Sequence, residues 1–308
     1  MATTKTAIDP RDWLLLVLLS VLWGGSFFFT GVAVRDTPPL TIVLVRVALA
    51  AAVLIPVMWI YGAGFPPRLR DWWPFLVMAV LNNVIPFTLL VIGQTLIPSG
   101  LASVLNATTP LFTILVMAAF REEALSARRV AGALLGVFGV VVLRGQGIDA
   151  SYRPTLGILL CLGAALSYGF AGLWGRRKLA GISPLTSATC QLSCSSLVML
   201  VLAGSIEWPH GLSMPGAASW IALLAFALLS TALAYLVFFQ ILVRSGASNV
   251  MLVTLLIPIT AILLGHFVLG ETLRGREIAG GLIIASALLV IDGRVVRLIR
   301  LTRKMTRP

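Results

Sequence analysis

The chain has 308 residues, of which 59% are hydrophobic and only 11% are charged, and its mean hydropathy is +1.01. This composition excludes an ordinary soluble domain and indicates an integral membrane protein, because a soluble core does not use so many apolar residues. The net charge of +12 does not indicate nucleic-acid binding, since the basic residues occupy short loops and the C-terminal tail rather than one folded face.

Ten apolar stretches predict ten membrane-spanning helices, because a helix satisfies all its backbone polar groups within one segment. In chain order they cover residues 13–34, 40–60, 72–97, 101–120, 127–143, 155–175, 182–204, 217–243, 247–269 and 276–293. We expect the first stretch to be a membrane span and not a signal peptide, because it is long for a signal and no convincing cleavage site follows it.

The distribution of Lys and Arg predicts the orientation. With the N-terminus inside, 17 of the 23 basic residues fall on the cytoplasmic side, 5 fall on the other side, and Arg46 lies within a span. This bias predicts a multi-pass protein of the bacterial inner membrane, with both termini in the cytoplasm. Residues 1–12 are then a cytoplasmic N-terminal segment, and residues 294–308 are a basic cytoplasmic tail.

The second half of the chain repeats the first. Residues 110–145 align without gaps on residues 258–293. The matching pairs include Pro110 and Pro258, Glu123 and Glu271, Gly132 and Gly280, Ser99-Gly100 and Ser245-Gly246, and Trp23-Gly24 and Tyr168-Gly169. We therefore expect two five-helix repeats, residues 13–145 and 146–293. Because five is an odd number, the second repeat enters the membrane from the opposite side, which is the arrangement used for alternating access.

The segment "NATTPLFTILV" (106–116) places polar residues inside a run without charges from Trp72 to Phe120. It is either a break between two buried helices or a place where polar groups are wanted inside the membrane. Pro110 recurs as Pro258, so we interpret the shared proline as a bend that serves a gate. Asn106 and Thr109 are predicted to line a cavity.

Two ionisable residues lie in mid-span, Arg46 and His266, whereas the acidic residues fall in loops, tails or helix ends. Arg46 either attracts a carboxylate or ties helices together, and the neutral Gln191 at the matching position favours the structural role. His266 is either a packing residue, which we favour, or a pH-sensitive gate. The absence of acidic residues in mid-span argues against the usual proton or sodium coupling.

Polar amides and aromatic rings share faces of several predicted helices. The residues predicted to line a central cavity are Trp23, Phe27, Asn82, Asn83, Phe87, Asn106, Thr109, Tyr168, Trp174 and Tyr235. Such a lining suits a small zwitterion with an apolar side chain. The alternative is that these polar groups only bond one helix to another.

The "LWGGSFFF" segment in the first helix, Arg46 in the second, and the P-x₁₂-E-x-L…G pattern seen twice resemble the drug/metabolite transporter superfamily, specifically its EamA-type exporters. The resemblance covers residues from about Trp13 to Gly293. It implies an all-α polytopic carrier with ten helices and a cavity between the two halves. Within the family the chain is most similar to bacterial exporters of aromatic and other neutral amino acids.

We therefore expect an exporter of small metabolites, most of all aromatic and other neutral amino acids. The alternatives are an exporter or facilitator of a different small metabolite or drug, a passive channel, or an intramembrane enzyme. No H-E-x-x-H motif, paired carboxylates or nucleotide loop indicates an enzyme. The expected partners are the small-molecule substrate and the lipid bilayer, without nucleic acid, metal, cofactor or a required oligomer.

Overall fold

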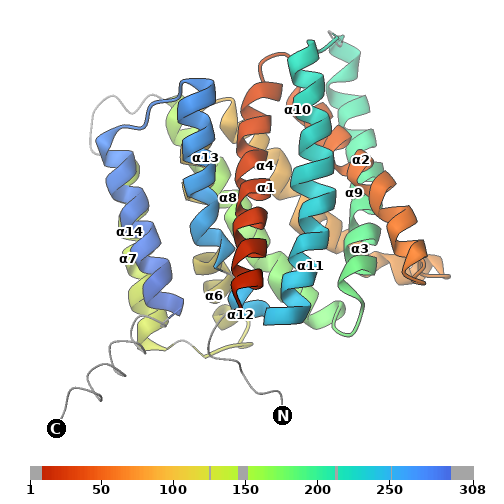
Figure 1. Cartoon of the computed structure of the whole chain (residues 1–308), viewed down its shortest axis with the longest axis horizontal. Coiled ribbons are helices and arrows are strands. Elements are labelled where there is room, and N and C mark those ends of the chain that lie inside the picture. Colours follow the sequence, from red (N-terminus) through yellow and green to blue (C-terminus); the bar gives the residue numbers. More distant parts are fainter. Residues whose placement is uncertain (1–8, 125, 145–151, 212–213, 251, 293–308) are drawn as a thin grey trace.

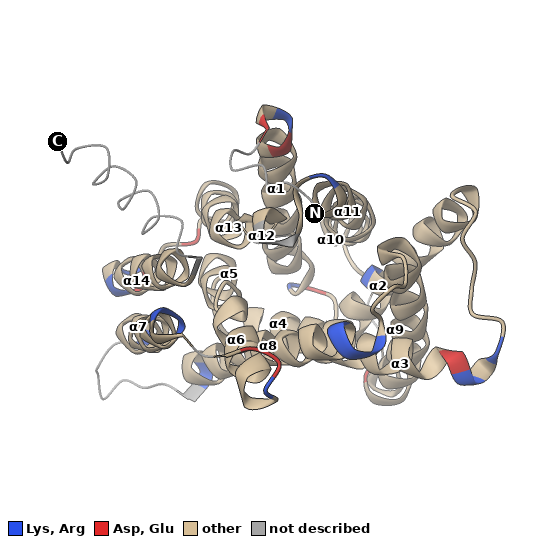
Figure 2. Cartoon of the chain, turned by 90° about the horizontal axis from the view of Figure 1, so that it is seen from below, with Lys and Arg blue, Asp and Glu red and all other residues tan. Residues whose placement is uncertain are grey.

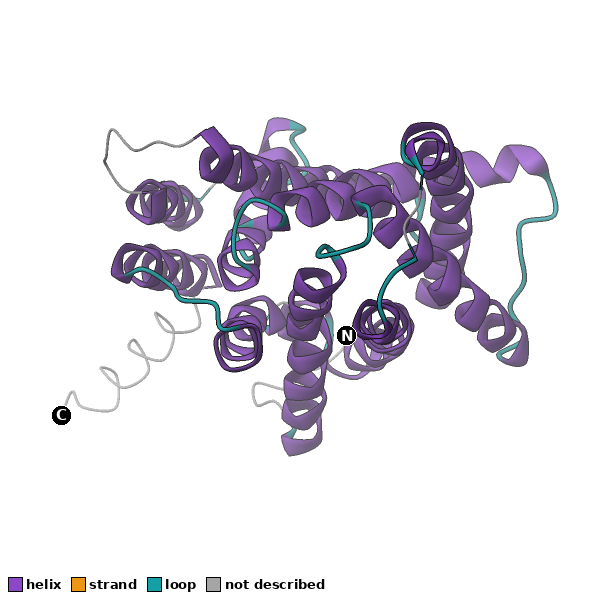
Figure 3. Ribbon diagram, turned by 90° about the horizontal axis from the view of Figure 1, so that it is seen from above, coloured by secondary structure: helices purple, strands orange, loops and turns teal. Residues whose placement is uncertain are grey.

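A computed structural model describes residues 9–124, 126–144, 152–211, 214–250 and 252–292 of the chain. In these ranges every regular element is a helix, and Figure 3 shows helices joined by short loops. The predicted cytoplasmic tail and most of the predicted N-terminal segment lie outside the described residues.

The first repeat forms five helical segments. Their elements are α1 (Pro10–Ala33), α2 (Pro39–Ile60), η1 (Leu69–Trp72), α3 (Trp73–Ala79), η2 (Val80–Val84), α4 (Ile85–Gln94), α5 (Ser99–Asn106), α6 (Thr109–Ala119) and α7 (Ala127–Arg144). The run from η1 to α4 is one span, in which η2 is a short π-helical stretch. The predicted helices of the first half therefore agree with the structure to within a few residues.

The second repeat follows the same plan. Its elements are α8 (Tyr152–Lys178), α9 (Pro184–Ile206), η3 (Trp208–His210), α10 (Ala217–Ala227), η4 (Leu228–Leu233), α11 (Ala234–Ser245), α12 (Ala247–Val250), α13 (Val253–Leu269) and α14 (Gly275–Asp292). Here η4 is also π-helical, and it lies in the eighth predicted span just as η2 lies in the third. The two repeats thus share an unusual feature at corresponding places.

Seven helices of the described chain are long and apolar enough to cross a membrane, and α13 is a shorter apolar helix. The helices α7 and α14 have 18 residues each and carry charged residues at their ends, which lowers their apolar character. A polytopic membrane architecture is therefore clear, whereas ten spans and cytoplasmic termini remain predictions. Figure 2 shows that charged residues occupy only short stretches of the ribbon.

A proline explains the π-helical stretch in the third span. Pro86 has no N–H, so it cannot donate to a carbonyl in the preceding turn. The hydroxyl of Ser167 on α8 donates instead to the carbonyl of Leu81, at 2.7 Å, five residues before Pro86. This bond from another helix satisfies a carbonyl that Pro86 leaves without a backbone donor, which ties α8 to η2.

The "NATTPLFTILV" segment contains a break between helices, as one of the two interpretations states. Helix α5 ends at Asn106 and α6 begins at Thr109, with Pro110 in its first turn. The hydroxyls of Thr108 and Thr109 donate to the carbonyls of Leu105 and Asn106, three residues earlier. In the second repeat Pro258 lies inside the continuous helix α13, so the two prolines do not have the same local structure.

Glycines let helices of different repeats approach closely. A Cβ on Gly24 of α1 would lie 2.6 Å from Thr260 Cβ on α13, and one on Gly169 of α8 would lie 3.1 Å from the carbonyl carbon of Phe112 on α6. Gly24 and Gly169 are a matching pair, so the same close approach occurs twice. Each repeat thereby packs its first helix against the fourth span of the other repeat.

Helices α7 and α14 pack against each other as a pair at one side of the molecule, on the left of Figure 1. A Cβ on Gly132 of α7 would overlap the side chain of Ile291 of α14, and one on Gly280 of α14 would lie 2.5 Å from Leu143 Cβ of α7. The alignment of the two repeats matches Gly132 with Gly280 and Leu143 with Ile291. The same contact is therefore made in both directions, and neither glycine has room for a side chain.

Candidate functional site

Arg46 lies in the first half of α2, inside the protein, with only 8% of its surface exposed. Its guanidinium carbon is 3.5 Å from the ring centroid of Phe87 and 4.2 Å from that of Phe226. Cation–π contacts of this kind stabilise a cation by about 2 kcal/mol or more when water is excluded. The rings come from α4 and α10, so Arg46 joins elements of both repeats.

The π-helical stretch η4 supplies a hydrogen bond that holds the Arg46 head group. Arg46 Nε donates to Thr231 Oγ1 at 3.0 Å, and that hydroxyl donates in turn to the carbonyl of Phe226 at 3.0 Å. Both Arg46 and Thr231 are almost fully buried. The widened turn of η4 thus presents its hydroxyl toward α2, and the second bond fixes the direction of that hydroxyl.

The other π-helical stretch, η2, makes the corresponding contacts on α9. Asn82 Nδ2 donates to Gln191 Oε1 at 3.1 Å, and Asn83 Nδ2 donates to Ser195 Oγ at 2.9 Å. Gln191 is the counterpart of Arg46 in the repeat. The second helix of each repeat therefore bonds to the π-helical stretch of the other repeat, with a cation on one side and a neutral amide on the other.

Two tyrosines complete the cluster between the repeats. Tyr168 and Tyr235 both lie near enough to Arg46 to interact with its charge. The ring of Tyr235 stacks on Phe239 with centroids 5.7 Å apart, and its hydroxyl lies within hydrogen-bonding reach of Asn82. We use the name central cluster for Arg46, Asn82, Asn83, Phe87, Tyr168, Gln191, Ser195, Phe226, Thr231 and Tyr235.

Half of the predicted cavity residues belong to this central cluster, namely Asn82, Asn83, Phe87, Tyr168 and Tyr235. Trp23 and Phe27 lie in an adjoining apolar cluster that also includes Tyr168, and the ring of Trp23 is 5.5 Å from that of Phe238. Trp174 lies elsewhere, because its Nε1 donates to the carbonyl of Pro74 at 2.9 Å and its ring contacts Trp73.

Asn106 and Thr109 lie at the break between α5 and α6. The Thr109 hydroxyl is used locally, whereas Asn106 Oδ1 is buried without a hydrogen-bond partner among the described residues. The sequence interpretation did not include Ser195, Phe226 or Ser230, and it used Gln191 only as the counterpart of Arg46. Gln191 and Ser195 are four residues apart on α9, and that spacing was the available signal.

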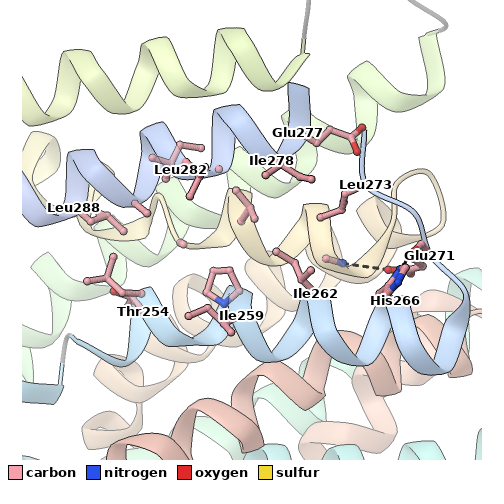
Figure 4. Close-up of a pocket in the computed structure, with 18 of the residues that line it drawn as sticks. Thr254, Ile259, Ile262, His266, Glu271, Leu273, Glu277, Ile278, Leu282 and Leu288 are labelled. Atoms are coloured by element: carbon pink, nitrogen blue, oxygen red, sulfur yellow. Dashed lines mark hydrogen bonds between the residues drawn. The ribbon is translucent and has the colours of Figure 1, made fainter. Parts of the chain in front are cut away.

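A hollow of about 620 Å³ lies apart from the central cluster, between α5, α13 and α14. Figure 4 shows its apolar lining, which includes Ile259, Ile262 and Leu282. Pro258 and His266, both predicted as gating residues, line this hollow. His266 is exposed near the end of α13, and its Nδ1 lies 3.1 Å from the carbonyl oxygen of Glu271.

Carboxylates join the two repeats at one end of the bundle. Glu271 accepts hydrogen bonds from Ser99 N at 2.9 Å and Ser99 Oγ at 2.7 Å, at the start of α5. Glu207 accepts from the N–H groups of Leu40 and Thr41 at 2.7 and 2.8 Å, at the start of α2. The negative charge favours the N-terminal ends of both helices.

Asp36 makes a third contact of this kind, from the α1–α2 loop. Its Oδ2 accepts from Gly216 N at 2.9 Å, just before α10. Hydrogen bonds from the Ser219 side chain and from Gly216 lower the pKa of Asp36 below its usual value of 3.8. Figure 1 places the α1–α2, α9–α10 and α13–α14 connections at the same upper end of the bundle.

At the other end, carboxylates pair with arginines. Glu122 and Glu123, between α6 and α7, form ion pairs with Arg177 at 2.6 Å and Arg176 at 3.2 Å, at the end of α8. Asp12 of α1 accepts from Arg244 Nε at 2.8 Å and also from the Ser245 hydroxyl. Among the described residues, no group of three or more His, Cys, Asp or Glu side chains could hold a metal ion.

The comparisons with known proteins agree with a two-repeat architecture. The model of the EamA-like transporter family matches residues 12–145 and again residues 155–292. An uncharacterized transporter, YvbV, of Bacillus subtilis is 28% identical over 294 residues, covering 94% of this chain and 93% of that protein. A probable amino-acid metabolite efflux pump of Escherichia coli is 25% identical over 299 residues, covering 92% of this chain and 95% of that protein.

A solved crystal structure supports the fold. It superimposes with a TM-score of 0.62 and 20% sequence identity, and the match covers 91% of this chain and 96% of that one. An uncharacterized inner membrane transporter of Escherichia coli, YedA, is 27% identical over 288 residues, covering 91% of this chain and 90% of that protein.

Proposed function

Because the chain belongs to the EamA-like transporter family, we propose that it exports small metabolites across the inner membrane, with aromatic and other neutral amino acids as its main substrates. The observation that carries this proposal is the central cluster, where amide and hydroxyl groups lie beside aromatic rings at the boundary between the two repeats. Amides and hydroxyls suit the charged ends of a zwitterion, and rings suit an apolar side chain.

Alternating access is the mechanism that this arrangement favours. A site that takes contributions from both repeats changes its accessibility when one repeat moves against the other. The paired π-helical stretches support this proposal, because such stretches are often found at functional sites. The name of the Escherichia coli efflux pump, which refers to amino-acid metabolites, supports the substrate class.

The experiment is a counterflow assay in proteoliposomes. Liposomes loaded with unlabelled phenylalanine, tryptophan or methionine should accumulate the labelled amino acid transiently, which a passive channel does not produce. A panel that includes other metabolites tests the substrate class. If those metabolites are exchanged and no amino acid is exchanged or competes, the amino-acid assignment is wrong.

Variants of the central cluster test the position of the site. Tyr235→Ala and Asn83→Ala should reduce counterflow more than they reduce the amount of folded protein. Trp174→Phe is the matched control, because it also alters a predicted cavity residue but one that lies outside the central cluster. Equal losses of transport and of folded protein in the cluster variants would show a purely structural role.

The orientation is a separate part of the proposal. With both termini in the cytoplasm, the carboxylate contacts of Asp36, Glu207 and Glu271 face the periplasm. Alkaline phosphatase fused after residue 308 should be inactive, and a fluorescent protein at the same place should be bright. The opposite result would reverse the assignment of the two faces.

A further inference from the structure

The outer edge of the Arg46 guanidinium is free. Nε is bonded to Thr231 and two rings lie against the guanidinium carbon, but within the described part of the chain the Nη atoms make no hydrogen bond and no ion pair. The Nη atoms are not fully shielded from solvent, and 8% of the surface of Arg46 is exposed. The Nη N–H groups therefore keep some accessible surface and have no acceptor among the described residues.

The charge of Arg46 has no counter-ion in the described structure. The acidic residues that form ion pairs there are Asp12, Asp71, Glu122 and Glu123, and none of them pairs with Arg46. An unpaired cation among buried residues is destabilising, even with help from aromatic rings. An anion that reached the Nη atoms would remove much of this penalty, and a planar carboxylate matches their geometry.

The repeat-related position shows that the arrangement is one-sided. Gln191, the counterpart of Arg46, accepts a hydrogen bond from Asn82. Ser230, the residue before Thr231 in η4, is 1% exposed, and its hydroxyl has no partner among the described residues. The pair is therefore unequal in charge, because Arg46 is a cation and Gln191 is a neutral amide.

We propose that Arg46 is the recognition site for a carboxylate, or a similar planar anionic group, of the transported molecule. This deepens the proposed function and rests on it, since the anion would be the α-carboxylate if the substrates are amino acids. Arg46 then has two roles, because the same residue joins α2 to η4 and takes the substrate charge. The structural role favoured by the sequence does not exclude the second one.

Three compounds of nearly equal shape test the proposal by thermal stabilisation of the purified full-length protein at neutral pH. Hydrocinnamate carries only the anion, hydrocinnamamide is neutral, and phenethylamine carries only the cation. Hydrocinnamate should stabilise the wild type at concentrations about ten- to hundredfold lower than the other two, because a charged hydrogen bond is lost without the carboxylate. Arg46→Gln, which copies Gln191, should abolish this preference, and Arg46→Lys should retain part of it.

The result that overturns the proposal is equal binding of the acid and the amide, or unchanged binding of the acid by Arg46→Gln. If Arg46→Gln does not fold, the comparison of acid and amide on the wild type decides alone. Arg46-dependent binding of hydrocinnamate without any exchange of amino acids would refute only the proposed substrate class. Exchange of amino acids with equal competition by their amides would refute only the Arg46 site.

A second inference rests on a different observation, the capping of α5 by Glu271. This contact joins the two repeats through Ser99 and Gly100, and Gly100 N lies 3.3 Å from Glu271 Oε2 (Figure 4). A Cβ on Gly265 would lie 2.5 Å from Glu271 Oε2, so the glycine leaves space for the carboxylate. The Glu271 carboxylate therefore links the end of α13 to the start of α5 through hydrogen bonds.

The repeat-related contact is not made among the described residues. Glu123 is the counterpart of Glu271, and Ser245-Gly246 is the counterpart of Ser99-Gly100. Glu123 instead pairs with Arg129 at 2.8 Å and Arg176 at 3.2 Å, and the Ser245 hydroxyl donates to Asp12. The α11–α12 and α13–α14 connections lie at opposite ends of the bundle in Figure 1. The Glu271–Ser99 contact is thus made while its repeat-related counterpart is not, and different contacts, Glu123–Arg176 and Asp12–Ser245, join the repeats at that end.

We infer that Glu271–Ser99 and Glu123–Ser245 are alternate closures of the two ends. The described state has the Glu271 closure made. In the other state Glu271 would leave Ser99, and Asp12 would leave Ser245. Glu123 would then exchange its arginine partners for the N–H and hydroxyl groups around Ser245. When two inverted repeats move against each other as rigid bodies, one end of the bundle closes as the opposite end opens.

Disulfide cross-linking in membranes tests this inference. The pair Ser99→Cys and Glu271→Cys should cross-link readily and block counterflow until the disulfide is reduced. The pair Glu123→Cys and Ser245→Cys should cross-link slowly, and adding Glu271→Gln should raise its rate severalfold. Glu277→Gln is the matched control, because within the described chain the carboxylate of Glu277, in the first turn of α14, bonds only to the N–H of Arg274 just before that helix.

An unchanged cross-linking rate with Glu271→Gln would overturn the inference. Transport that continues after the two cysteines introduced at positions 99 and 271 are joined would overturn it as well. If Glu271→Gln does not fold, the Ser99 and Glu271 pair decides alone. The coupling between the two ends is measured without any substrate, so its failure is distinguishable from failure of the proposed function.

Discussion

The bond from Ser167 to the carbonyl of Leu81 supports a quantitative prediction. Replacing Ser167 by Ala leaves that carbonyl buried without a donor, because Pro86 cannot supply one. An unsatisfied buried polar group costs about 1–3 kcal/mol, and measured hydrogen bonds between membrane helices contribute about 0.6–1.7 kcal/mol. We therefore expect Ser167→Ala to lower the free energy of unfolding by about 1–2 kcal/mol.

The reason for this loss is tested by a second substitution. Pro86→Ala restores the backbone N–H, which can then serve the preceding turn without help from α8. Ser167→Ala should consequently have little effect in the Pro86→Ala background, so the two changes should couple by about 1 kcal/mol. Ser20→Ala is the control, because in the described structure its hydroxyl bonds only to the carbonyl of Val17 of the same helix, at 2.8 Å.

The assay is reversible unfolding in mixed micelles of dodecyl maltoside and SDS, followed by tryptophan fluorescence and circular dichroism. Four proteins are compared, the wild type, each single variant and the double variant. If the effect of Ser167→Ala is the same with Pro86 and with Ala at position 86, the bond does not compensate for the proline. Our explanation of η2 would then be refuted.

Three further predictions concern stability. Hydrogen bonds from Ser219 and Gly216 lower the pKa of Asp36, so its contribution is fully present above the ordinary carboxyl pKa and is lost as the pH falls through the lowered pKa. Thermal melts of wild type and Asp36→Asn should therefore differ at about pH 6 and converge once the pH is below the lowered pKa. Gly24→Ala should destabilise by about 1–3 kcal/mol in mixed micelles, whereas Gly172→Ala, where the nearest atom is 3.6 Å away, should have little effect. Trp174→Phe removes the hydrogen bond to the carbonyl of Pro74, so it should lower the free energy of unfolding by about 0.5–1.5 kcal/mol and leave the KM for transport unchanged. A higher KM would show that Trp174 contacts the substrate.

The fold was largely predictable from the sequence because apolar length and turn residues determine where membrane helices begin and end. Pro39 and Pro184, for example, both stand in the first turn of a helix. The π-helical stretches were not predictable in the same way. They depend on Pro86 together with a donor on α8, and on Thr231 together with Arg46, and these partners are far apart in the sequence.

The candidate site was predictable only in part. Helical periodicity showed that Asn83 and Phe87 share a face, and both belong to the central cluster. Periodicity indicates the face of a helix on which a residue lies, but not whether the residue lies near the middle or near the end of the helix. Trp174 was therefore assigned to the cavity, although it lies near the end of α8 and contacts Trp73 at the start of α3. The partners of Arg46 come from two other spans, the third and the eighth, and no spacing within α2 indicates them.

The packing of α7 against α14 bears on how such a chain can originate. Ile291 packs against Gly132, and Leu143 packs against Gly280. The interface is therefore self-complementary, as the interface of an isologous dimer is. A protein consisting of a single five-helix repeat would expose a last helix whose ideal partner is the same helix in an oppositely inserted copy. Two such copies could assemble before their genes were joined, and the fused chain would retain the dimer contact as an internal one.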